Sequence, residues 1–232
     1  MLYTEENVRD NLRNREGKRV FYLGKGDQLT SGARDFLTRE RIPILPAQQA
    51  KPETYRLLSG GTMAEKPEHM THLNGDTLVP KTHPRIHFRG KLDTLEGVLL
   101  LCQCQIPARK EELGQILSLS REILRCDVLD APLPEKNLLG LTAEELRHRS
   151  HFPQEYYHQP HFMPNAEDGS ALLWLNIARC AAREAELAAV DAFSDREGEP
   201  TRVDILRAMN RISSALYLLM IQEKAASRNA EC

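Results

Sequence analysis

The chain has 232 residues, of which 41% are hydrophobic, so it is large enough for one large domain or for one domain with a small appendage. Its formal net charge of −2 argues against a nucleic-acid-binding protein or a membrane-surface protein, because such proteins usually carry a basic face. The sequence shows no run of about 18 apolar residues and no secretory signal at its start, so we expect neither a membrane span nor export.

The beginning of the chain, residues 1–45, predicts a small α/β unit. The stretch TEENVRDNL opens like a capped helix, RVFYL has the composition of a strand, and Thr30 is placed to cap a second helix that precedes a second strand at IPIL. Residues 46–68 carry proline and glycine with few large apolar groups, which predicts a linker. The expected domains are an α/β domain with its linker over residues 1–66 and a helical domain over residues 67–232.

From about residue 85 the pattern becomes helical. Apolar residues recur at steps of three and four in EELGQILSLSREILRCDVL, and Thr142 with Glu145 forms a capping box for a short helix. A loop rich in histidine, proline and aromatic residues follows over residues 148–170, before the two long segments SALLWLNIARCAAREAELAAVDAF and VDILRAMNRISSALYLLMI. The expected fold is mainly α, a four- or five-helix bundle with a small α/β N-terminal domain.

The five cysteines are odd in number, and three of them, Cys102, Cys126 and Cys180, lie in apolar helical patterns. This predicts reduced, buried thiols in a cytosolic protein. No Cys-x-x-Cys pair occurs, so we expect no cysteine zinc site.

Two His-x-x-His pairs lie in the loop region and raise the question of a metal site. Their members are His148, His151, His158 and His161. Because the segment contains proline and shows no helical periodicity, the spacing does not place these side chains on a shared face. We therefore expect solvated histidines rather than metal ligands.

The first of the two long segments carries a charged stripe on an otherwise apolar helix. Arg179, Arg183 and Glu186 are separated by four and then three residues, which places them within an arc of roughly 60°. A helix that is apolar almost all round is normally buried, and buried charges are costly unless they are paired or bind a ligand. The stripe is therefore either an internal Arg183–Glu186 salt bridge or an anion site for a phosphate or carboxylate. The local spacing leaves both open.

Three further groups of polar residues are candidates for a site. Asn210 lies in a polar stripe of the last helix, with hydrogen bonding to its own backbone as the alternative. Asp93 precedes an apolar run and fits either a helix-start charge or a catalytic group. The turn-rich segment THLNGDTLVPKTHPR offers backbone N–H groups and an ammonium group to phosphates. Its candidate residues are Thr71, Gly75, Asp76 and Lys81.

The motifs follow one another in an order that resembles a known family. THLxxGD is followed by Lys81, by PRIHFRGKLD, by a Phe-Met-Pro loop, by ARxxxRxAE and by MNRISS. This order resembles the ATP:corrinoid adenosyltransferases of the helical-bundle type. The segments Thr-His-Leu, Pro-Arg-x-x-Phe-Arg and Asn-Arg-x-Ser-Ser are most similar to the ethanolamine-utilisation branch of that family, and the resemblance covers nearly the whole chain.

The resemblance implies a role for each candidate residue. Arg179 would pair with Asp93, often across a subunit interface, and Phe162 would shield the lower face of the corrin ring. Together with Arg183 these residues form the expected catalytic set. ATP would be held by residues from three motifs, namely Arg183, Glu186 and Asn210, and by Lys81 with Thr71, Gly75 and Asp76 around the triphosphate.

The implied activity is the transfer of the 5′-deoxyadenosyl group of ATP to reduced cobalamin, with Mg²⁺ helping to stabilise the departing triphosphate. The resemblance also implies a homo-oligomer with active sites near subunit interfaces. It would work in the cytoplasm or a bacterial microcompartment and serve an ethanolamine ammonia-lyase system.

The sequence departs from this branch of the family in three places. One is the paired Arg-Arg of the family, which is Arg183-Glu184 here and loses one possible phosphate contact. Many members carry a metal-binding cysteine cluster before Thr-His-Leu, but the corresponding segment GGTMAEKPEHM has no cysteine, so no metal site is expected. The family's glycine after Gly-Asp is also missing, because Thr77 and Leu78 follow Asp76. The missing glycine favours one alternative, a non-catalytic corrinoid or nucleotide carrier. The other alternative is a purely structural helical bundle.

Overall fold

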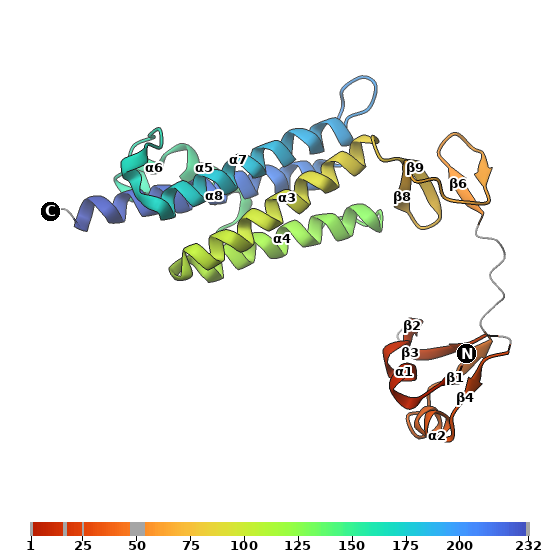
Figure 1. The fold of residues 1–232 in the computed structure, drawn as a ribbon. Helices are drawn as coiled ribbons and strands as arrows, with labels where there is room; N and C mark the ends of the chain where they lie inside the picture. The colour runs from red at the N-terminus through yellow and green to blue at the C-terminus, as the bar shows by residue number, and fades with distance from the viewer. Residues whose placement is uncertain (1, 16–17, 25, 47–53, 231–232) are drawn as a thin grey trace. The chain divides into compact units, whose positions relative to one another are not determined.

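The computed structural model describes residues 2–15, 18–24, 26–46 and 54–230. The chain divides into two compact units, one formed by residues 1–56 with 60–66 and the other by residues 57–59 with 67–232. The first unit combines small sheets with two helices, and the second is dominated by long helices (Figure 1). This confirms the prediction of a mainly α protein with a small α/β region.

The first unit is built from short strands and two capped helices. Thr4 forms a capping box with Asn7 at the start of the first helix, and Thr30 caps the second, as their sequence positions predict. The strands pair as β1 with β4 and β3 with β5, both parallel, and β2 with β3, antiparallel. In chain order the elements are β1 (Leu2–Tyr3), α1 (Glu5–Asp10), β2 (Arg13–Arg15), β3 (Lys18–Leu23), β4 (Gln28–Leu29), α2 (Ser31–Arg39) and β5 (Ile44–Pro46).

The predicted linker contains regular structure. Strands β6 (Tyr55–Leu57) and β7 (Thr62–Met63) pair in antiparallel fashion, and Gly60 lies between them at a φ of +90°, which glycine adopts without strain. Residues 55–57 and 62–63 of the predicted linker are therefore strands, whereas its residues 47–53 lie outside the described residues. A pair this short has no apolar periodicity for the sequence to reveal.

The second unit opens with a β-hairpin where the sequence predicts only turns. Strands β8 (Met70–Asn74) and β9 (Thr77–Pro80) are antiparallel, and Gly75 occupies the turn at a φ of +51°. Leu73, Leu78 and Val79 are buried. The hairpin lies at the end of the bundle at which α3 begins (Figure 1).

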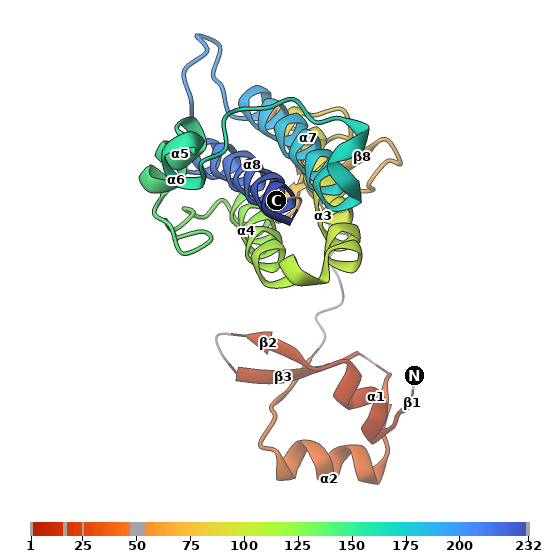
Figure 2. The same ribbon diagram turned by 90° about the vertical axis from the view of Figure 1, so that its left-hand side faces the viewer.

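The bundle, shown from the side in Figure 1 and end-on in Figure 2, consists of four long helices. They are α3 (Pro84–Gln105), α4 (Lys110–Val128), α7 (Gly169–Ala192) and α8 (Val203–Ala230). The helix α3 packs against α7 and α4, and α8 packs against α7. The core between them includes Phe88, Leu92, Leu95 and Leu99, all 0% exposed. None of the helices in the described ranges is long and apolar enough to cross a membrane.

Two short helices interrupt the segment predicted as a histidine-rich loop. The capping box of Thr142 and Glu145 starts α5 (Ala143–His151), as predicted. His148 and His151 consequently lie in the last turn of this helix, and α6 (Pro153–Tyr157) follows at once. Pro153 explains the boundary, since proline disfavours helical geometry in the preceding residue but suits the first position of a new helix.

The helix α7 is apolar almost all round, which predicts that it is buried, but part of its surface is exposed. Ile177 is 49% exposed and Leu187 is 71% exposed, so one apolar side of the helix faces outward. Cys180 lies on this side and is exposed, which makes the prediction of a buried thiol wrong there. Cys102 and Cys126 are buried and free, as predicted, and burial raises the pKa of the Cys102 thiol to about 11.

An ion pair at the start of α8 makes the stability of the bundle depend on pH. Arg202 donates from Nε and Nη2 to the Asp204 carboxylate at 3.0 and 2.9 Å, and the Leu133 backbone N–H donates to the same carboxylate at 2.9 Å. The Arg202 hydrogen bonds lower the pKa of Asp204 from 3.8 to about 2. This carboxylate therefore stabilises the fold above about pH 4, and the contribution is lost as pH falls towards 2.

We expect the Asp204→Asn variant to lose about 2 kcal/mol of unfolding free energy at neutral pH, because each unit of pKa shift corresponds to about 1.4 kcal/mol. Urea denaturation of both proteins at neutral pH and near pH 2.5 measures the effect. The gap between wild type and variant should narrow at the acidic pH. An equal gap at both values would contradict the assigned linkage.

Candidate active site

A cavity of about 740 Å³ opens between α7, α8 and the segment that precedes α7. The helices α7 and α8 run antiparallel, since Arg179 contacts Tyr217 while Glu186 contacts Asn210. This packing brings the charged stripe of α7 opposite the polar stripe of α8. Four of the residues predicted from the sequence line the cavity: Phe162, Arg179, Arg183 and Asn210.

Glu186 is held by α8 and not by the arginine on its own helix. Asn210 Nδ2 donates to Glu186 Oε1 at 2.7 Å, and Ser213 Oγ donates to Glu186 Oε2 at 3.3 Å. The alternative of an internal Arg183–Glu186 salt bridge is not realised among the described residues. Asn210 likewise uses its side chain between helices, which removes the alternative of hydrogen bonding to its own backbone.

The two arginines of the stripe present their charge to the cavity without a carboxylate partner in the described chain. Arg183 is exposed and makes no ion pair there, while the Arg179 guanidinium lies over the Tyr217 ring, 5.1 Å from its centre. A guanidinium carries several donors in a planar fork that matches carboxylate or phosphate oxygens. The stripe therefore has the chemistry of an anion site.

Aromatic side chains form a second wall of the cavity. The Phe162 and Tyr217 rings are stacked with centres 6.4 Å apart, and His161 lies parallel to Tyr217 at 5.8 Å. His161 Nε2 lies 3.1 Å from the His151 carbonyl oxygen and Nδ1 lies 2.7 Å from the Tyr217 hydroxyl, so Nε2 donates and Nδ1 of the neutral ring accepts. Burial raises the pKa of the Tyr217 hydroxyl.

His161 and Tyr217 are not among the site residues predicted from the sequence. Tyr217 lies seven residues after Asn210, and this spacing predicts that it shares the polar stripe of α8 without indicating a role there. His161 has no comparable signal, because only the folded loop brings it to α8. The described residues contain no cluster of three or more histidine, cysteine, aspartate or glutamate side chains able to hold a metal ion.

Comparison with known proteins identifies the family of this chain. A family model described as cobalamin adenosyltransferase matches residues 62–223. The chain belongs to the cobalamin adenosyltransferase family. It is 31% identical over 242 aligned positions to the corrinoid adenosyltransferase EutT of Salmonella typhimurium, an alignment that covers 94% of this chain and 90% of that protein. The same identity and coverage hold for the corrinoid adenosyltransferase EutT of Escherichia coli strain K12.

Membership of this family makes the chain an enzyme, an adenosyltransferase. Six other residues predicted to serve it do not line the cavity that contains Arg183, and one of them, Glu186, is hydrogen-bonded to Asn210, which does. Asp93 is exposed on α3, and no hydrogen bond or ion pair reaches it from the described residues. The remaining four lie in or next to the β8–β9 hairpin: Thr71, Gly75, Asp76 and Lys81.

The adenosyltransferase hairpin is attached at the end of α3 that is level with the C-terminal end of α7, beyond the arginine stripe. The helices α3 and α7 run antiparallel, as the Lys91–Glu184 ion pair at 2.7 Å and the Cys102–Trp174 contact at 3.3 Å show. The start of α3, where the hairpin is attached, is thus level with the end of α7. Within one chain the structure leaves the hairpin and the cavity apart.

Asp127 fixes the hairpin to the bundle of this adenosyltransferase. Its carboxylate is 0% exposed and accepts from Arg85 Nε at 2.7 Å and from Arg89 Nε at 2.6 Å. Arg89 also donates to the backbone carbonyls of His72 and Leu73 in β8, at 3.3 and 2.7 Å. One buried carboxylate therefore joins α4, α3 and the strand that carries Thr71.

Proposed function

We propose that this adenosyltransferase moves the 5′-deoxyadenosyl group of ATP to the cobalt of reduced cobalamin in the cavity between α7 and α8. The observation that supports this most strongly is the pair Arg179 and Arg183, which line a cavity of about 740 Å³ without a carboxylate partner in the described chain. A site of this charge and size suits a polyphosphate.

In this proposal Arg183, Glu186 and Asn210 hold ATP. Arg183 would donate to the triphosphate, while Glu186 and Asn210, linked at 2.7 Å, would offer acceptor and amide groups to the nucleoside. The Co(I) ion of the substrate attacks C5′ of the ribose, so a Co–C bond forms while the C5′–O bond breaks and the triphosphate leaves with the electron pair. Arginine charge beside the leaving group stabilises the negative charge that develops there.

Mg²⁺ would accompany ATP in this proposal. Because the described residues hold no metal-ligand cluster, the ion would be bound chiefly by phosphate oxygens and water, as Mg²⁺ commonly is. The chain's own contribution is to bind and orient the nucleotide, and orientation alone supplies a large part of such a barrier reduction.

We further propose a homo-oligomer in which one copy completes the site of another. Arg179 and Asp93 each lack an ion-pair partner among the described residues, and a pair across the interface would satisfy both. The hairpin of one copy would then bring Lys81, with Thr71, Gly75 and Asp76, to the triphosphate held by another. Exposed apolar side chains on α3 and α7 provide surface for such contacts: Leu100, Leu101, Ile177 and Leu187.

Phe162 is proposed to shield the lower face of the corrin ring, where an apolar group would displace the lower axial ligand and ease the reduction of Co(II). It lies in the aromatic wall of the cavity, stacked on Tyr217. We expect Phe162→Ala to slow Co(II) reduction about tenfold, the effect of roughly 1.4 kcal/mol, and to change the ATP dissociation constant less than about twofold. Stopped-flow reduction and ATP titration measure the two quantities, and equal losses in both would contradict this role.

The setting we propose is ethanolamine utilisation, in the cytoplasm or a bacterial microcompartment, with adenosylcobalamin passed to an ethanolamine ammonia-lyase. The motif order of the chain supports this setting, as does its 31% sequence identity to each of the two EutT proteins. Cobalamin would be the corrinoid, which the family description supports.

A spectroscopic assay with cob(I)alamin, Mg²⁺ and ATP tests the function. Loss of the Co(I) absorbance with growth of adenosylcobalamin, unchanged by a transition-metal chelator, is the expected result. Binding of ATP and corrinoid without turnover would instead indicate the carrier. The absence of both turnover and an ATP-dependent thermal shift would leave the structural bundle.

A further inference from the structure

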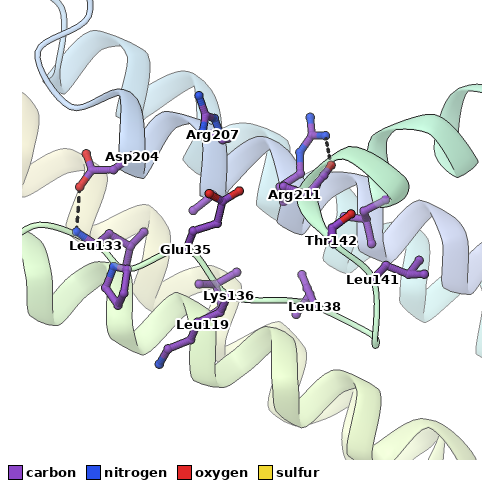
Figure 3. A pocket seen from close by; sticks show the side chains of 14 residues that line it. Leu119, Leu133, Glu135, Lys136, Leu138, Leu141, Thr142, Asp204, Arg207 and Arg211 are labelled. Atoms are coloured by element: carbon purple, nitrogen blue, oxygen red, sulfur yellow. Dashed lines mark hydrogen bonds between the residues drawn. The ribbon is translucent and has the colours of Figure 1, made fainter.

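Arg211 is the neighbour of Asn210 on α8, but its side chain lies outside the cavity that holds the arginine stripe. It lines instead a separate, largely apolar pocket of about 150 Å³ between α8, α4 and the segment from Leu133 to Ala143 (Figure 3). A substrate bound in the active-site cavity would not contact this pocket. Any effect of Arg211 on the reaction must therefore pass through another residue.

The hydrogen bonds of Arg211 identify that residue as Asn210. Arg211 Nη1 donates to the Ala143 carbonyl oxygen at the start of α5 at 2.9 Å, the contact drawn in Figure 3, and Nη2 donates to Asn210 Oδ1. Asn210 Nδ2 in turn donates to Glu186 Oε1 at 2.7 Å. An unbroken chain of donors and acceptors thus runs from the start of α5 to the charged stripe of α7.

This chain fixes the orientation of the Asn210 amide. A guanidinium can only donate and an ionised carboxylate can only accept, so the amide oxygen must face Arg211 and the amide nitrogen must face Glu186. A flipped amide would place donor against donor and acceptor against acceptor. Asn210 therefore faces the cavity in one defined orientation, with Glu186 held against its amide nitrogen.

The cost of placing Arg211 here indicates that the contact is not incidental. Its Nε is buried and has no acceptor among the described residues, and burial, followed by the charge of Arg147, lowers the pKa of the guanidinium. A buried donor without an acceptor destabilises a fold. The apolar pocket around Arg211 would favour an uncharged side chain.

We infer that Arg211 is a positioning residue for nucleotide binding, which orients the Asn210 amide and through it Glu186 without touching the substrate. The inference rests on the proposed function, in which Asn210 and Glu186 hold ATP. It predicts that loss of Arg211 impairs the use of ATP specifically and leaves the use of the corrinoid unchanged.

The test replaces Arg211 with methionine, which keeps an apolar stem of similar length and removes every donor. We expect KM for ATP to rise about tenfold, the usual effect of losing one hydrogen bond to a charged group, and KM for the corrinoid to stay within about twofold. In an Asn210→Ala background, Arg211→Met should cause no further loss, because its effect passes through that amide. If the double variant raised KM for ATP by the product of the two single-variant effects, the inference would be overturned.

Arg207→Met is the matched control, because Arg207 lies one turn earlier on α8 and lines the same small pocket but makes no hydrogen bond to Asn210. Its KM for ATP should equal that of wild type, and a rise equal to that of Arg211→Met would overturn the inference. Should Arg211→Met fail to fold, Arg211→Lys keeps the charge and one donor, and its KM for ATP should be higher than that of wild type by less than about tenfold. A lysine variant with the same KM for ATP as wild type would also contradict a role for the planar guanidinium of Arg211.

A readout that does not depend on activity separates this inference from the proposed function. In ¹⁵N-labelled protein the side-chain amide protons of Asn210 should exchange slowly with solvent in wild type and faster in Arg211→Met. If wild type neither binds ATP nor turns over, the proposed function fails while this exchange difference still tests the positioning role. Equal exchange in both proteins would overturn that role.

Discussion

Replacing Arg183 with alanine is expected to lower kcat by about 10²- to 10³-fold, the range found when one donor to a developing anionic charge is removed. The melting temperature should stay unchanged, because Arg183 is exposed and no ion pair holds it in the described part of the chain. The cob(I)alamin assay and a thermal melt measure the two quantities. Full activity in this variant would contradict the placement of ATP on the stripe.

Arg121→Ala is the control for the loss of one positive charge. Arg121 lies on α4, where its side chain is 59% exposed and pairs with Glu96 at 3.3 Å, outside the cavity. Activity should match wild type because Arg121 lies outside the cavity. The Glu96 side chain is 15% exposed and keeps its hydrogen bond from Ser120, so stability should fall by no more than about 1 kcal/mol.

The Arg183→Ala variant also tests whether sites are shared between copies. Co-expressed with a Lys81→Ala copy, it should regain activity that neither variant shows alone, because some mixed sites would combine an intact stripe with an intact hairpin. No regain would place both residues in one chain's site.

Replacing Asp127 with asparagine is expected to remove about 3–5 kcal/mol of unfolding free energy, the usual cost of breaking a buried ion pair by neutralising one partner. The substitution keeps the shape of the side chain but turns one acceptor into a donor that faces a guanidinium. Arg85 and Arg89, whose side chains are 17% and 14% exposed, would be left with too little negative charge. Urea denaturation, monitored by the circular dichroism of the helices in the far ultraviolet, measures the loss.

The same change should loosen the β8–β9 hairpin, because Arg89 joins Asp127 to the carbonyls of His72 and Leu73. Hydrogen exchange in residues 70–80 should therefore rise more than in the core of α7. Asp130→Asn is the control, since Asp130 is 67% exposed and lies 3.9 Å from Arg85. A loss of stability in Asp130→Asn equal to that in Asp127→Asn would contradict the role of burial.

The local features of this protein were readable from the sequence because they depend on near neighbours in the chain. Thr4, Thr30 and Thr142 cap helices through contacts within three residues, and all three were predicted. The alignment of Arg179, Arg183 and Glu186 follows from helical spacing alone. The order of motifs was sufficient to indicate the family, which the comparisons confirm.

Tertiary structure decided what those local features do. From the sequence, the stripe on α7 was consistent with a salt bridge and with an anion site. Antiparallel packing places Asn210, 24 positions away, in hydrogen-bond contact with Glu186, while Arg183 lines a cavity. Asp127 serves as an anchor only because two arginines about 40 positions earlier lie against it. Cys180 and Leu187 lie in an apolar stretch that predicts burial, but no other described helix covers the side of α7 on which they lie, and both are exposed. Spacing along one helix determines which side chains share a face, but only the packing of other helices determines what that face meets.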